Sequence, residues 1–290
     1  MRKYILLIVW LSGLFFAFGQ EPTKEDTTDS LIDDFFYSED AIIDDLINSL
    51  KKYQFLYVSV AYNSDTYFAG RDIGIDQFNI APQLTYANSN GLYASLSGIY
   101  YSEFEPQWDV TTASLGFSKN FGKQQLFKYN VSFSKYFYAN DADNIFSNTL
   151  NLGLGVRSKD RSIGTQITGS FLFGDEQSFQ ISSRSYVSIN LVKNKKMTLK
   201  FRPQLNIIAG KQTIELTRVY IENREPVVEY IENDIFDVIN TQINIPLQLN
   251  LNSFDVELGY NLNLPSAIGT EDVLDSTGFF NLTLSYLIDL

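Results

Sequence analysis

The stretch from Val238 to Leu264 constrains the fold most strongly, because its residues alternate between apolar and polar with a strict period of two. The first arm, 239–251, has mainly Ile and Leu at odd positions and mainly Asn and Gln at even positions. After Asn252-Ser253, the second arm, 254–264, carries its apolar residues at even positions. This alternation predicts two β-strands, each with one apolar and one polar face.

The length of the two arms separates two kinds of β-protein. Strands of a soluble sandwich usually stop after about five or six residues. Both arms exceed ten residues, which is the length that a tilted strand needs to cross a bilayer. We therefore interpret the stretch as one hairpin of a transmembrane β-barrel.

The same alternation recurs from Tyr53 to the end of the chain and predicts twelve strands. We expect them at about 53–63, 77–88, 92–102, 108–118, 126–138, 147–157, 163–173, 179–191, 197–209, 239–251, 254–264 and 280–290. An even number places both ends of the barrel chain on one side of the membrane. The expected fold is all-β, a transmembrane antiparallel up-and-down barrel preceded by a short N-terminal amphipathic helix.

Every second predicted connection is short and most of the others are longer, although 103–107 and 174–177 are small. Short turns on one side and longer loops on the other are typical of outer-membrane barrels. Strands two and three both turn even positions outward, so an odd-length loop must join them. Ser89-Asn90-Gly91 fits, with Gly91 in the left-handed conformation. In the hairpin 239–264, the apolar residues lie at odd positions of the first strand and at even positions of the second. This change requires an even-length loop, and the two-residue loop Asn252-Ser253 provides it.

Two irregular stretches carry their own predictions. The apolar residues Trp108 and Val110 have the opposite parity to the rest of their strand, which predicts a β-bulge. Segment 211–237 is rich in β-branched residues around a central Asn223-Arg224-Glu225-Pro226. It predicts that the flanking strands continue as a hairpin above the membrane, and a disordered loop is the alternative.

The front of the chain predicts an exported protein. Residues 1–19 read as a signal peptide, with Arg2 and Lys3 before an apolar core and a cleavage site before Gln20. A membrane-anchoring helix is the alternative, but the apolar run is shorter than the roughly twenty residues that a spanning helix needs. Residues 53–290 then form the barrel domain.

Residues 20–52 form an acidic N-terminal segment with one predicted amphipathic helix. Ser38 is a suitable N-cap, and the apolar stripe along 42–50 must be buried against something. The helix could enter the barrel, lie on the inner leaflet or bind a protein partner.

Composition excludes several functions. The chain contains no Cys and no His, so it has no disulfide framework and lacks the side chain best suited to proton transfer near neutral pH. Without Arg2 and Lys3 it holds 20 basic against 34 acidic residues, a net charge of −14. A charge of this sign argues against nucleic-acid binding. We expect no enzymatic activity, no cofactor and no metal site.

The leader, the alternating segments and the final strand ending at Leu290 resemble those of Gram-negative outer-membrane β-barrel proteins, at the level of architecture. Many such proteins end in Phe, and Leu290 departs from that pattern. The resemblance implies an outer-membrane location and contact with the lipid bilayer and lipopolysaccharide. It also implies insertion by the barrel-assembly machinery. Enzymatic barrels of the phospholipase, protease and deacylase types use a catalytic His, which this chain lacks.

Parity also predicts which charged side chains line the lumen. Basic residues are expected on strands five, six, eight and nine, and acidic residues on the last two strands. They are Lys128, Arg157, Arg184, Lys200, Arg202, Asp255, Glu257 and Asp289. Amides surround them: Asn79, Gln83, Asn151, Gln166, Gln180, Asn206, Gln242, Asn244, Gln248 and Asn261.

Three interpretations of this inward face stay open. In the first, the charges pair across a satisfied polar interior, and in the second they set a transverse field across a water-filled pore. In the third, the acidic helix enters the barrel as a plug, with Asp40, Asp44 and Asp45 meeting the basic wall. For function, the sequence favours a small porin-like channel, with gating by this helix. The alternative is a non-conducting structural or assembly subunit with an envelope protein partner.

The plug hypothesis predicts a difference in conductance. A variant that begins at Tyr53 should conduct more than the mature chain from Gln20 in planar bilayers, because it lacks the plug. Equal conductance of the two proteins would contradict the hypothesis.

Overall fold

The computed structural model describes residues 54–72, 74–122, 124–139, 146–194, 197–222, 225–251, 253–267 and 273–290, with backbone alone for 212–235. The predicted signal peptide (1–19) and the acidic segment (20–52) lie outside the described residues, as do Asp40, Asp44 and Asp45. No helix among the described residues is long and apolar enough to cross a membrane.

A closed antiparallel β-barrel accounts for the described chain. Its strand segments are β1 (Gln54–Asn63), β2 (Asn79–Asn88), β3 (Leu92–Tyr101), β4 (Trp108–Phe121), β5 (Phe127–Tyr138), β6 (Phe146–Arg157), β7 (Ile163–Gly174), β8 (Gln177–Val187), β9 (Ile189–Lys193), β10 (Thr198–Phe201), β11 (Gln204–Glu222), β12 (Glu225–Leu251), β13 (Phe254–Pro265) and β14 (Thr277–Asp289). The barrel closes because β1 pairs with β14 and β11 pairs with both β8 and β12. β8–β9 and β10–β11 are each one interrupted strand, so twelve strands form the wall, as the sequence predicts.

Two prolines explain the interruption between β10 and β11. Pro203 has no N–H to donate, although its carbonyl accepts a hydrogen bond from the Val187 N–H at 3.1 Å. Pro246, inside β12, accepts from the Arg202 N–H at 3.2 Å and has no N–H to give back. The ladder therefore loses two donors at one level of the wall, and the strand segments stop there.

The outer face of the barrel carries an apolar band flanked by two belts of aromatic residues, an arrangement typical of membrane barrels. Exposed aliphatic side chains along the middle include Leu84, Leu96, Leu115, Leu152, Ile167, Leu205, Leu247, Leu258 and Leu282. Exposed aromatic side chains lie toward the longer loops (Tyr62, Phe78, Trp108, Phe137, Phe171, Phe179 and Phe280) and toward the short turns (Phe121, Phe127, Phe254 and Tyr286). The abundance of aromatic residues in the sequence thus corresponds to two belts on the surface.

Several local predictions are confirmed. Gly91 has a φ of +97° in the three-residue turn between β2 and β3. A register shift between Ile99 and Tyr100 leaves one extra residue on β4 before Val110. Trp108 is exposed there, whereas Val110 is buried. The predicted bulge therefore exists, and it turns Trp108 outward, while Val110 faces inward like the other even positions of β4.

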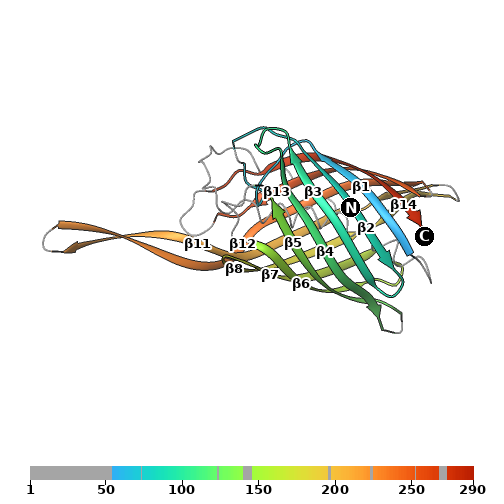
Figure 1. The fold of residues 1–290 in the computed structure, drawn as a ribbon, viewed down its shortest axis with the longest axis horizontal. Coiled ribbons are helices and arrows are strands. Elements are labelled where there is room, and N and C mark those ends of the chain that lie inside the picture. Colours follow the sequence, from blue (N-terminus) through green and yellow to red (C-terminus); the bar gives the residue numbers. More distant parts are fainter. Residues whose placement is uncertain are drawn as a thin grey trace, which may run out of the picture.

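The predicted long hairpin also exists in the backbone. β11 and β12 stay paired as far as Glu222 opposite Glu225, whereas β8 pairs with β11 only up to Gly210. Figure 1 shows the two strands projecting as a twisted ribbon from one end of the barrel, while β14 ends at the other. The ribbon lies at the end that carries the longer loops.

Two turn glycines give a test of backbone strain. A Cβ at Gly91 would lie 2.5 Å from the Ser118 carbonyl oxygen, whereas one at Gly122 (φ +88°) would meet only Phe127, at 3.4 Å. Gly91→Ala should lower the free energy of unfolding by about 1–3 kcal/mol more than Gly122→Ala, because both strain φ but only the first creates a clash. Urea titration of the barrel in detergent micelles measures the difference. Equal losses would contradict the role given to the carbonyl contact.

Candidate functional site

Amide side chains line the inner face of the wall formed by β11 to β14. This amide wall consists of Gln204, Asn206, Asn240, Gln242, Asn244, Gln248, Asn261, Asn263 and Asn281, and all nine are buried. They face inward because even positions of β11 and β12 and odd positions of β13 and β14 share one side of the sheet. The strict alternation of the sequence is therefore what assembles this surface.

One row of the amide wall forms a continuous chain of hydrogen bonds. Asn206, Gln242, Asn263 and Thr277 lie directly opposite one another on successive strands. The Asn206 amide donates to Gln242 at 3.1 Å, Gln242 donates to Asn263 at 3.0 Å, and Asn263 donates to Thr277 at 3.2 Å. The Thr277 hydroxyl then donates to the Gly70 carbonyl at 2.7 Å.

A second chain runs toward the short-turn end and ends on a carboxylate. Asn244 donates to Asn261 at 2.6 Å, and Asn261 donates to Asn281 at 3.1 Å. Asn281 and Gln248 then donate to the two oxygens of Glu257, at 3.4 Å and 2.6 Å. Each amide donates a hydrogen bond to the next acceptor, so the chain restricts the conformations of all its side chains.

The connection between β1 and β2 folds back onto this wall. Within it, residues 64–72 form what we term the inserted loop. Phe68 and Arg71 exchange two backbone hydrogen bonds, of 3.0 Å and 2.8 Å, around the turn residues Ala69 and Gly70. Ala69 has a φ of +50° and Gly70 a φ of +76°, the left-handed pair that a tight two-residue hairpin turn requires.

The tip of the inserted loop packs on the inner face of β11 and β12. Ala69 forms a buried apolar cluster with Ile208 and Ile239. Ile239 lies at a register shift between β11 and β12, which turns this residue inward. Gly70 lies against the fully buried side chain of Asn240, which a Cβ on Gly70 would approach to 2.7 Å. Because β13 and β14 separate β1 from β12, the loop spans part of the lumen.

The base of the inserted loop is tied to the start of β2. Asp65 accepts hydrogen bonds from the Thr66 N–H at 2.8 Å and the Tyr67 hydroxyl at 2.9 Å. Asn79 donates to the Thr66 hydroxyl at 3.0 Å, and Asn63 donates to Asn79 at 2.8 Å. Burial, together with the hydrogen bond to Asp65, raises the pKa of Tyr67, so its phenol stays protonated as a donor.

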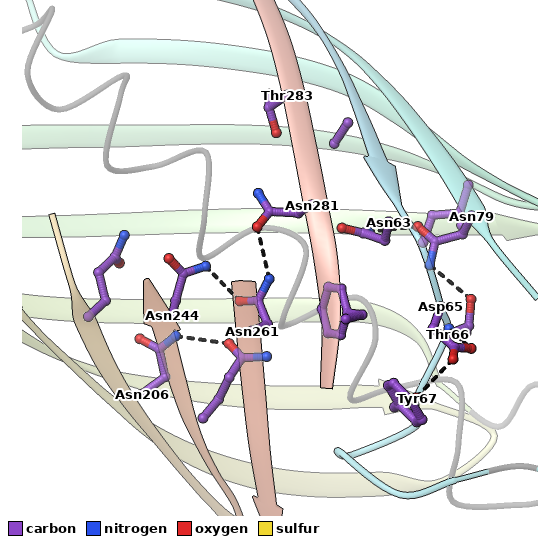
Figure 2. A pocket seen from close by; sticks show the side chains of 15 residues that line it. Asn63, Asp65, Thr66, Tyr67, Asn79, Asn206, Asn244, Asn261, Asn281 and Thr283 are labelled. Carbon is purple, nitrogen blue, oxygen red and sulfur yellow. Dashed lines mark hydrogen bonds between the residues drawn. The ribbon is translucent and has the colours of Figure 1, made fainter. Parts of the chain in front are cut away.

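A pocket lies between the base of the inserted loop and the amide wall (Figure 2). Its interior of about 60 Å³ has room for a few water molecules. Side chains of the loop, the amide wall and the neighbouring strands line it: Ala61, Asn63, Asp65, Thr66, Tyr67, Asn79, Ile99, Gln204, Asn206, Gln242, Asn244, Asn261, Phe279, Asn281 and Thr283. Figure 2 shows the labelled asparagines on both sides of this hollow.

Four of the eight predicted lumen charges are buried in the wall: Arg184, Arg202, Asp255 and Glu257. The Arg202 guanidinium lies 4.0 Å from the centre of the Tyr186 ring, a cation–π contact. Arg184 lies opposite Asn206, at the start of the first amide row. These positions place Arg184 on β8, Arg202 just after the end of β10, and the two acidic residues on β13.

The other four are less buried. Lys128 and Lys200 are half-buried, and Asp289 is exposed at the end of β14. The Arg157 guanidinium donates to the Gln125 carbonyl at 3.1 Å and 3.3 Å, so it supports a turn. None of the eight charged residues lines the described pocket.

The inserted loop is the part of the site that sequence reasoning missed. Segment 64–76 reads as a plain connection, and only Ala69-Gly70 between Phe68 and Arg71 hints at a tight turn. Parity did identify Asn206, Gln242, Asn244 and Asn261 as inward-facing amides. It could not show that a distant loop would close a pocket over them.

No protein-family model and no curated protein sequence matches the chain. Among solved structures, the NanC porin aligns with a TM-score of 0.47 at 10% identity, covering 80% of this chain and 98% of that one. An outer-membrane channel from Pseudomonas putida F1 gives 0.46 at 10% identity, with coverage of 83% and 97%. The translocator domain of autotransporter NalP from Neisseria meningitidis gives 0.43 at 10%, with coverage of 91% and 99%.

The closed barrel of twelve antiparallel strands, with its apolar exterior, by itself has the porin-like architecture that the sequence resembles.

The seating of the inserted loop is testable through Gly70. In Gly70→Val, the side chain meets Asn240, so backbone amides of 66–71 should exchange hydrogen at least about tenfold faster. Gly74→Val is the matched control, because Gly74 has a similar φ of +70° and a Cβ placed there would meet no atom within 4 Å. Asn240→Ala in the Gly70→Val background should restore part of the protection. Unchanged exchange in Gly70→Val would contradict the packing of the loop tip on Asn240.

Proposed function

We propose that the protein is an outer-membrane channel through which small hydrophilic solutes pass. The observation that carries the proposal is the contrast between the two faces of one closed wall. The outer face is apolar between two aromatic belts, while the inner face is lined with amides. A closed ring of strands satisfies its own backbone groups, which any spanning structure must do in hydrocarbon.

The apolar band supports a bilayer location, since an exposed surface of this extent would be unfavourable in water. With the predicted signal peptide, it favours the outer membrane of a Gram-negative bacterium. Contact with lipid and lipopolysaccharide, and insertion by the barrel-assembly machinery, follow from that location as parts of the proposal.

The dimensions of the barrel support passage of small solutes only. Barrels of about eight strands are filled by side chains, whereas those of sixteen leave an open channel. Twelve strands fall between these sizes, and the inserted loop narrows the lumen further. Inside it, amide groups replace part of a solute's hydration shell. Gating by the helix of residues 38–52 stays a prediction, because that segment lies outside the described residues.

We propose no catalytic step. The chain has neither His nor Cys, and no group of three Asp or Glu among the described residues is placed to hold a metal ion.

A structural or assembly subunit is the second candidate, and the β11–β12 ribbon favours it. Beyond Gly210, β11 pairs only with β12 among the described residues. The outer edges of such a ribbon present backbone donors and acceptors that another strand can pair with. Stoichiometric co-purification with an envelope protein, together with a closed lumen, would support this alternative.

Conductance tests the channel. The mature protein in planar bilayers should give discrete conductance steps, and replacing 66–71 by a short Gly-Ser linker should raise them severalfold, because the inserted loop narrows the lumen. Liposome swelling with sugars of increasing size gives an independent measurement. A folded barrel that is silent in both assays, with and without the loop, would overturn the proposal.

A further inference from the structure

The pocket beneath the inserted loop has an unusual balance of polar groups. Eight Asn and Gln side chains line it, whereas Asp65 is its one charged residue, and no Lys or Arg belongs to its described lining. The predicted lumen charges lie elsewhere along the wall. The pocket therefore recognises its occupant by hydrogen bonds rather than by ion pairing.

Two of these amides present acceptors without a donor. The Oδ1 atoms of Asn206 and Asn244 have no hydrogen-bond partner among the described residues, and the two side chains are only 6% and 4% exposed. Their NH₂ groups are already committed to Gln242 and Asn261. A buried acceptor without a donor is unfavourable, so these oxygens favour a ligand that donates hydrogen bonds.

The single carboxylate of the pocket, Asp65, disfavours an anionic ligand and offers only weak binding to a cationic one. Both oxygens of Asp65 already accept hydrogen bonds, from the Thr66 N–H and the Tyr67 hydroxyl. An anionic ligand would face Asp65 without any basic group in the pocket lining to balance it. A neutral ligand that donates through hydroxyl groups fits these constraints best.

Aromatic rings supply an apolar surface beside the amides. Tyr67 and Phe279 both line the pocket, with ring centroids 6.2 Å apart and planes at 38°. Because Tyr67 donates to Asp65, its ring is held in place. Hydroxyl-binding amides next to aromatic rings match a sugar, which carries hydroxyls on its edge and C–H groups on its faces.

We propose that this pocket binds a neutral polyhydroxylated solute of the monosaccharide class. Sugar hydroxyls donate to Asn206 Oδ1 and Asn244 Oδ1, and the sugar ring lies against Tyr67 and Phe279. The enclosed interior measures about 60 Å³ and adjoins open space, so the sugar extends beyond the enclosed part. The inference deepens the proposed function by naming the solute, but binding itself does not require conduction.

Saturation-transfer NMR on the mature protein in detergent, titrated with D-glucose, tests the site. Saturable binding is expected, and Asn206→Leu or Asn244→Leu should raise the dissociation constant at least about tenfold, because each removes an acceptor at similar volume. Asn130→Leu is the matched control. Asn130 is 8% exposed, also has an Oδ1 without a described partner, and lies outside the pocket. Phe279→Leu, a second variant, should weaken binding by removing the ring.

The outcomes separate this inference from the channel proposal. Glucose binding that is lost in the two pocket variants and kept in Asn130→Leu supports the site, even if the protein does not conduct. Conductance without saturable glucose binding overturns the site and leaves the channel. Preference for cationic glucosamine or anionic gluconate over glucose, or equal effects of all three Asn variants, also overturns it.

Discussion

The pairing of every backbone polar group within the wall is the constraint on which the rest of this structure depends. Hydrocarbon offers no partner for an N–H or C=O group, so the sheet must close, and it does so through β1 and β14. At one level the ladder loses the donors of Pro203 and Pro246, whose own carbonyls still accept hydrogen bonds from the Val187 and Arg202 N–H groups. Closure therefore tolerates two prolines while the ring stays intact.

Closure of the sheet also converts the alternation of polar residues along each strand into rows of polar side chains that run across the strands. Because antiparallel strands place residues directly opposite one another, amides spaced two apart on several strands become rows around the lumen. Asn206, Gln242 and Asn263 are separated widely in sequence but form one hydrogen-bonded row. Glu257 ends the neighbouring row and accepts from two amides. The interior is thus a connected polar network in which each side chain restricts its neighbours.

The inserted loop uses that interior as its docking surface. Its tip needs a small residue, since Gly70 lies directly on Asn240, and it needs an inward-facing apolar spot, which the register shift beside Ile239 provides. Thr277 joins the loop to the end of an amide row. Loop and wall together form the pocket, so the proposed solute site belongs to neither element alone.

The sequence by itself determined the barrel, its twelve strands, the bulge before Val110 and the conformation of Gly91. These features follow from local rules, since side-chain parity and turn length are fixed by residues near one another in the chain. It also identified the inward amides, but not which would meet, because hydrogen-bonded rows depend on register across several strands. The inserted loop, the pocket and the pairing of Gly70 with Asn240 were decided only by the tertiary structure. They join residues some 170 positions apart, and no local pattern encodes a contact that exists only after the ring has closed.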